Sequence, residues 1–136
     1  MSGFVLDSSV LIAILAAEPD ADRFKRYIDD DINAQISAAT VHEAFCVVSG
    51  ERFRNGAARL DRMLGLIGPV IVPFDASQLS ASREAYVRFG KGSGHPANLN
   101  MGDCFSYALA KTRNLPLLFK GNDFIHTDIE PALKPA

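Results

Sequence analysis

The N-terminal part of the chain reads Phe4-Val5-Leu6-Asp7-Ser8-Ser9-Val10-Leu11-Ile12, which is an apolar run, three polar residues and a second apolar run. The short continuous run Phe4–Leu6 is typical of a strand that is buried on both faces. Ser8 or Ser9 is then expected to cap a helix over Val10–Ala17, which Pro19 ends. Asp7 therefore falls at the carboxyl end of a buried strand, where open α/β sheets bind ligands.

The rest of the chain continues this alternation of strands and helices. Apolar spacing predicts helices over 20–30, 37–49, 53–67, 76–89 and 100–111, and strands over 34–36, 70–72 and 115–119. In the helix over 37–49, Val41, Phe45 and Val48 are expected to form one buried stripe. Strands that alternate with helices over this length predict an α/β sandwich around a parallel sheet.

Length and composition limit the class of protein. A chain of 136 residues with 48% hydrophobic and 22% charged residues predicts one globular domain over residues 1–136. A net charge of −2 disfavours a protein that coats nucleic acid. No apolar stretch reaches the roughly 18–20 residues of a membrane span, and no basic segment precedes an apolar leader. Cys46 and Cys104 stand far apart, which is typical of reduced thiols in the cytoplasm.

Four acidic residues interrupt otherwise apolar surroundings. Asp7 and Asp123 each follow a predicted strand, whereas Glu43 and Asp103 lie in the first turns of predicted helices. Strand carboxyl ends and the helix starts that follow them share one edge of a parallel sheet, so these side chains are expected to converge. Oxygen ligands without His or Cys favour Mg²⁺, with Mn²⁺ as a substitute, over Zn²⁺.

Each acid also has a purely local interpretation. Thr40-x-x-Glu43 fits a capping box at a helix start. Asn100-x-x-Asp103 fits an N-cap followed by an acidic residue that favours the helix dipole. The acid after the first strand can accept backbone N–H bonds from the next turn, and the one after the last strand can be a turn residue. The coincidence of all four predicted positions favours the shared site.

Taken in order, these motifs resemble the PIN-domain family and, within it, the VapC-like ribonuclease toxins of toxin–antitoxin pairs. The resemblance is carried by Leu6-Asp7-Ser8-Ser9, by the segment 37–43 that ends in Glu43, by Leu99-Asn100-Met101-Gly102-Asp103-Cys104 and by Leu118-Phe119-Lys120-Gly121-Asn122-Asp123-Phe124. It implies a PIN-like three-layer α/β/α sandwich and a metal-dependent endoribonuclease that cuts structured RNA, often tRNA or rRNA.

The resemblance also implies roles for single residues. Asp7 and Asp103 look like direct Mg²⁺ ligands, and Glu43 looks like a ligand or a base that orients water. Ser9 corresponds to a supporting hydroxyl, and Asn100 caps the helix that carries Asp103. The fourth acid departs from the family pattern, because the usual register falls on Asn122 and the acid Asp123 comes one residue later. We expect Asp123 to supply the charge, with Asn122 in support.

The expected reaction is hydrolysis of an RNA phosphodiester bond by a metal-activated water. Because an acidic cleft repels RNA, basic residues near it are needed for phosphate contacts. The candidates, each of which could equally belong to a solvated helix face, are Arg52, Arg54, Arg59, Arg62 and Lys91.

Expected partners follow from the resemblance. They are RNA, a VapB-like antitoxin that lies over the active-site groove, and a second copy of the chain, giving a homodimer within a toxin–antitoxin hetero-oligomer. The helices over 20–30 and 37–49 are candidate surfaces for these contacts. Two alternatives stay open: a phosphatase of the haloacid dehalogenase type, which needs an Asp where Ser9 stands, and a degenerate PIN domain that only binds.

Overall fold

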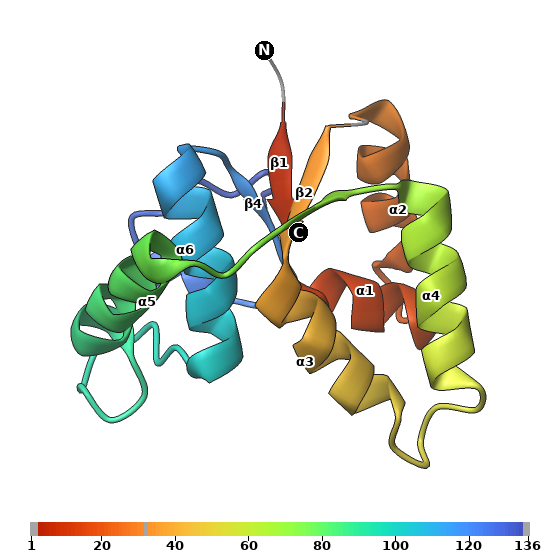
Figure 1. Cartoon of the computed structure of the whole chain (residues 1–136), viewed down its shortest axis with the longest axis horizontal. Coiled ribbons are helices and arrows are strands. Elements are labelled where there is room, and N and C mark those ends of the chain that lie inside the picture. Colours follow the sequence, from red (N-terminus) through yellow and green to blue (C-terminus); the bar gives the residue numbers. More distant parts are fainter. Residues whose placement is uncertain (1–2, 32, 135–136) are drawn as a thin grey trace.

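The central sheet is parallel and four-stranded in the computed structural model, which describes residues 3–31 and 33–134. Its strands are β1 (Phe4–Leu6), β2 (Ala34–Ser37), β3 (Val70–Val72) and β4 (Leu117–Leu118), in the order β3-β2-β1-β4 (Figure 1). β1 pairs with both β2 and β4 and is therefore internal. The predicted parallel sheet is confirmed, although its last strand is shorter than the predicted 115–119.

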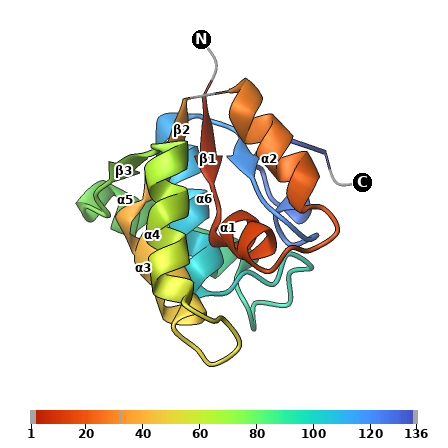
Figure 2. The ribbon, with the colours of Figure 1, turned by 90° about the vertical axis from the view of Figure 1, so that its right-hand side faces the viewer.

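Helices cover both faces of this sheet. One face carries α1 (Ser8–Leu15), α2 (Ala21–Asp30), α3 (Ala38–Val48) and α4 (Gly56–Ile67), whereas α5 (Ala76–Phe89) and α6 (Met101–Arg113) lie side by side on the other (Figures 1 and 2). A short 3₁₀ turn, Phe124–His126, follows β4. The predicted three-layer α/β/α sandwich is confirmed.

The alternation of side chains along β1 divides the core into two parts. Phe4 and Leu6 pack with the residues of α1 to α4, and Val5 packs with those of α5 and α6. All three side chains are fully buried, as expected for an internal strand covered on both faces. β1 is thereby fixed from both sides, and so is the position of the residue that follows it.

The start of α1 differs from the prediction. The helix begins at Ser8, and its N-cap is Asp7 rather than Ser8 or Ser9, because the Asp7 carboxylate accepts the backbone N–H of Ser9 at 3.1 Å. The chain leaves the strand and enters the helix without an intervening loop. The acid at the strand end is therefore the residue that caps the helix.

The local interpretation of Glu43 is wrong, and so is the placement of Phe45 in the buried stripe of α3. Its N-cap is Ser37, whose hydroxyl accepts the N–H of Ala39 at 3.2 Å, so Thr40 and Glu43 do not form a capping box. The buried face of α3 consists of Thr40, Ala44 and Val48, and Phe45 is 45% exposed. Small side chains occupy the buried face because α3 packs against both α1 and α6 there.

None of the helices in the described ranges is long and apolar enough to cross a membrane.

Candidate metal centre

Asp7 is a buried carboxylate with hydroxyl groups on both of its oxygens. Oδ2 accepts from the Ser9 hydroxyl at 2.5 Å, and Oδ1 accepts from the Ser106 hydroxyl at 2.5 Å. Burial raises the pKa of Asp7, and the hydrogen bonds from Ser106 and Ser9 oppose that rise. The carboxylate is thus held in one orientation at the carboxyl end of β1.

Asp103 reaches the same edge of the sheet from the first turn of α6. The N-cap predicted at Asn100 is confirmed, and it is part of a capping box: the Asn100 side chain accepts the Asp103 N–H at 2.8 Å, and Asp103 accepts the Asn100 N–H at 3.0 Å. Burial raises the pKa of Asp103 to about 7, and the negative charges of Asp7, Asp123 and Glu43 add to the rise. These four acids therefore converge on one region of the molecule, as the topology predicts.

Glu43 approaches from α3 and lies over the first turn of α6. A Cβ added to Gly102 would lie 1.7 Å from Glu43 Oε2, so only glycine leaves room for the carboxylate in this position. Oε1 of Glu43 is buried without a hydrogen-bond partner. Burial raises the pKa of Glu43 and the charge of Asp7 raises it further, whereas a hydrogen bond from the Ser8 side chain lowers it.

The turn after β4 places the two candidates for the fourth position differently. Asp123 precedes the 3₁₀ turn, and its charge contributes to the raised pKa of Asp103. Asn122 instead lines a depression with residues of α2 and the turn, including Asp20 and Arg23. The role of either residue stays a prediction.

Ser9 connects this turn to the Asp7 site. Its hydroxyl accepts the backbone N–H of Lys120 at 2.9 Å while it donates to Asp7. The hydroxyl predicted to support the site thus joins the end of β1 to the residue that opens the turn after β4.

Sequence reasoning missed Ser106 and Gly102. Ser106 is fully buried, donates to Asp7 and lies 3.4 Å from the Thr40 hydroxyl on α3. Ser106 stands three residues after Asp103, about one helical turn away, so the helical period places it near the acids. Only the fold shows that its hydroxyl donates to Asp7. Gly102 belongs to the motif Leu99–Cys104, but the sequence does not show that the Glu43 carboxylate packs against it.

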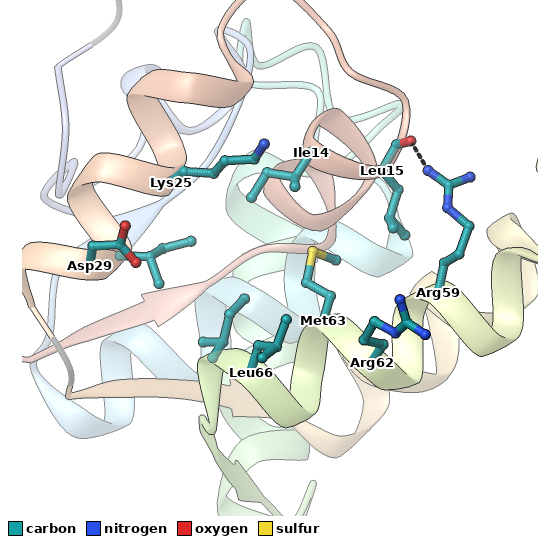
Figure 3. Close-up of a pocket in the computed structure, with 10 residues that line it drawn as sticks. Ile14, Leu15, Lys25, Asp29, Arg59, Arg62, Met63 and Leu66 are labelled. Carbon is teal, nitrogen blue, oxygen red and sulfur yellow. Dashed lines mark hydrogen bonds between the residues drawn. The ribbon is translucent and has the colours of Figure 1, made fainter.

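The basic residues predicted to contact phosphate lie in two regions of the molecule. Arg52 and Arg54 lie in the loop between α3 and α4, and Lys91 lies in the loop between α5 and α6; both loops project at the end toward which β1 and β2 point (Figure 1). Arg59 and Arg62 lie on α4, and the guanidinium of Arg59 donates to the carbonyl oxygen of Leu15 at 2.6 Å (Figure 3). That bond fixes Arg59 to the end of α1. Whether any of these residues binds RNA stays a prediction.

The carboxylates have the chemistry of a site for a hard cation. Among residues 3–31 and 33–134, no three carboxylate, His or Cys side chains are close enough to hold a metal ion in the positions seen. Two observations nevertheless fit one: Glu43 Oε1 is buried and unpartnered, and burial together with neighbouring negative charges raises the pKa of Asp103. A divalent cation with oxygen ligands would remove both sources of instability.

The fold and this cluster define a class of protein. The sequence profile of the PIN domain matches residues 4–130, so the chain belongs to the PIN domain family. The haloacid dehalogenase alternative is therefore wrong, in agreement with Ser9 in place of the second acid that it needs.

The chain is similar to several VapC proteins within this family. Ribonuclease VapC42 of Mycobacterium tuberculosis is 42% identical over 129 residues, which cover 94% of this chain and 98% of the relative. The crystal structure of Mycobacterium tuberculosis VapC20, a sarcin–ricin loop cleaving toxin, has a TM-score of 0.75 at 12% identity and covers 93% of this chain and 96% of that one. DNA-bound VapBC from Salmonella typhimurium has a TM-score of 0.63 at 19% identity, with 96% and 97% covered.

Proposed function

We propose that this protein is a metal-dependent endoribonuclease and the toxin of a VapBC-type toxin–antitoxin pair. The observation that carries the proposal is geometric: Asp7 at the end of β1 accepts a hydrogen bond from Ser106 of α6, and the Glu43 carboxylate packs against Gly102, next to Asp103 in the same helix. The similarity to Ribonuclease VapC42 over nearly the whole chain supports RNA as the substrate. We also propose that residues 1–136 form one PIN-like domain in the cytoplasm; residues 1–2, 32 and 135–136 of it lie outside the described residues.

The roles of the residues follow from their positions. Asp7 and Asp103 would hold Mg²⁺ or Mn²⁺, and Ser9 and Ser106 fix the orientation of the Asp7 carboxylate by donating to its two oxygens. Glu43, with its unpartnered oxygen, orients the attacking water and accepts its proton. A bound divalent ion supplies a more acidic water and offsets negative charge on the phosphate oxygens. Asp123 adds a further carboxylate, with Asn122 beside it in the chain.

The antitoxin surface is proposed for the α1–α2–α4 face. A cavity of about 420 Å³ there has an apolar floor that includes Ile14, Met63 and Leu66, and basic side chains of Lys25 and Arg62 at its edge (Figure 3). Leu66 is 81% exposed, which is unusual for a large apolar side chain and indicates that a bound partner buries it. A VapB-like antitoxin segment with apolar and acidic residues fits this surface, and the solved VapBC complex supports such a partner.

The exposed side of α3 is the proposed contact between two copies. Phe45 and Val47 are 45% and 44% exposed on this helix. The predicted homodimer would bury them, and the predicted hetero-oligomer would combine this contact with the antitoxin surface on α1, α2 and α4.

Cleavage of a total RNA pool tests the proposed activity. Purified antitoxin-free protein is incubated with the pool in Mg²⁺ or in EDTA, beside an Asp7→Asn variant whose fold is checked by circular dichroism. We expect discrete fragments with Mg²⁺ that are absent in EDTA and absent with Asp7→Asn. Absence of cleavage by folded protein in Mg²⁺ and Mn²⁺, with RNA from the native host, would contradict the proposal and favour a degenerate binding domain.

A further inference from the structure

A second cavity lies on the opposite face of the sheet from the α1–α2–α4 surface. It measures about 500 Å³, within the range of small-ligand sites, and lies between α5 and the start of α6. Asn100 and Met101, which line it, belong to the same helical turn as Asp103. A molecule in this cavity would therefore contact the helix that carries Asp103, on the side of α6 away from Gly102 and Ser106.

Tyr86 forms one wall of the cavity and is held in place. Its hydroxyl donates to the carbonyl oxygen of Lys91 at 3.1 Å. Its ring packs directly against Gly90, where an added Cβ would lie 2.7 Å from Tyr86 Cδ1. Tyr86 is nevertheless 47% exposed. The cavity therefore presents a fixed and partly exposed aromatic ring.

Two basic side chains of the cavity are free to meet a negatively charged ligand. Arg83 and Lys91 line it, are exposed, and form no ion pair within residues 3–31 and 33–134. Arg88 on the same helix differs, because it lies 3.7 Å from Asp128 and stacks over Phe89. The cavity thus combines uncompensated positive charge, an aromatic ring and the exposed Met101.

We propose that this cavity binds one unpaired nucleotide of the RNA, across α6 from the proposed metal centre. Its base stacks on Tyr86 and contacts Met101, and its phosphate meets Arg83 and Lys91, because single-stranded RNA is held by stacking on aromatic rings and by basic side chains along the backbone. This inference rests on the proposed function, since it names a further binding site for the RNA on the same helix as Asp103.

RNA binding by the Asp7→Asn protein tests the proposal without any cleavage. Fluorescence anisotropy of a labelled single-stranded oligonucleotide of mixed sequence is measured in that background for Tyr86→Ala, Tyr86→Phe and Arg83→Ala. Arg26→Ala, which removes an exposed charge from α2, is the matched control. We expect Tyr86→Ala to weaken binding about tenfold and Tyr86→Phe to bind like the parent. Arg83→Ala is expected to reduce the slope of log affinity against log salt by about 0.7, and Arg26→Ala to leave it unchanged.

The outcomes separate this site from the proposed activity. If the wild-type protein cuts RNA in Mg²⁺ while Tyr86→Ala and Arg83→Ala keep the parent affinity and KM, the nucleotide site is refuted and the nuclease stands. If the Asp7→Asn protein binds no RNA at all, the nucleotide site is refuted as well. If these variants instead change the mass measured by light scattering with RNA affinity unaltered, the cavity belongs to a contact between copies and the proposal is overturned.

Discussion

Gly102→Ala tests whether the Glu43 carboxylate acts from the position in which the fold places it. The new Cβ would lie 1.7 Å from Glu43 Oε2 and 2.3 Å from Cδ, whereas real Cβ contacts are essentially never under 3.0 Å. The carboxylate must therefore move by at least about 1.3 Å. It can do so, because it is the far end of a flexible side chain whose helix need not move.

The cost in stability is expected to be small. Alanine is favoured over glycine by about 1 kcal/mol inside a helix. Forcing the Glu43 side chain off its preferred rotamer costs on the order of 1 kcal/mol. The two contributions oppose each other, so the free energy of unfolding should change by less than about 1 kcal/mol and the Tm by less than about 5 °C.

The effect on cleavage is expected to be large. Misplacing a catalytic group by about 1 Å can reduce the rate about 100-fold, and Gly102→Ala displaces a carboxylate that we assign to the attacking water. The rate is measured with a fixed RNA substrate under saturating Mg²⁺, together with a thermal melt of the same protein. A folded variant with at most a few per cent of the wild-type rate is the expected result.

Gly65→Ala is the matched control, because Gly65 lies on the exposed side of α4 and an added Cβ meets nothing within 4 Å. It should raise the free energy of unfolding by about 1 kcal/mol and leave cleavage unchanged. Wild-type cleavage by Gly102→Ala, with Glu43 still required for activity, would refute the assignment of Glu43 to this position.

Three further predictions concern the acids. In EDTA, the raised pKa of Asp103 means that its contribution to the free energy of unfolding is complete near pH 4 and is lost as the pH rises through about 7, on the order of 2 kcal/mol or more. The Tm should therefore fall between pH 5 and pH 8, and Mg²⁺ should restore it mainly at pH 8. A pH-independent Tm in EDTA would contradict this. Ser106→Ala removes the donor to Asp7 Oδ1, so the Mg²⁺ concentration for half-maximal cleavage should rise about 10- to 100-fold, and an unchanged Mg²⁺ requirement would show that this bond is only structural. Asp123→Asn should raise the Mg²⁺ requirement while Asn122→Ala should not, and the reverse order in a Mg²⁺ titration would assign the fourth position to Asn122.

The arrangement of the acids was predictable because it depends on topology. Parallel strands joined by right-handed connections bring Asp7, Asp103 and Asp123 to one edge whatever the side chains around them are. The N-cap at Asn100 was predictable for a different reason, since the spacing that identifies it is local.

Details that depend on contacts between elements were not predictable. The apolar spacing of 37–49 places Phe45 in the core, yet α3 packs against α1, α4 and α6, and close approach to these helices selects the small residues Thr40 and Ala44. Similarly, Ser106 becomes a partner of Asp7 only across 99 positions of sequence. The periodicity of helices and strands predicts contacts between residues that are near in sequence, and therefore not this one.

The exposure of the edge strand β3 was not predictable either. The run 70–72 is predicted as a strand from its apolar residues, yet Val70 and Ile71 of β3 are 63% and 52% exposed. β3 is the last strand on its side of the sheet, so only β2 covers one of its edges. The spacing of apolar residues predicts the strand but does not say which strand lies at the edge.

The most direct measurement follows bound metal and cleavage in the same samples. Mn²⁺ is titrated into wild-type protein and an Asp103→Asn variant, free Mn²⁺ is quantified by electron paramagnetic resonance, and the initial rate of RNA cleavage is recorded at each point. If the acids form the catalytic metal site, the wild-type rate rises in proportion to bound Mn²⁺, and Asp103→Asn loses both binding and cleavage over the same range. Full cleavage without bound Mn²⁺, or Mn²⁺ binding that Asp103→Asn leaves intact, would contradict a metal centre at these carboxylates.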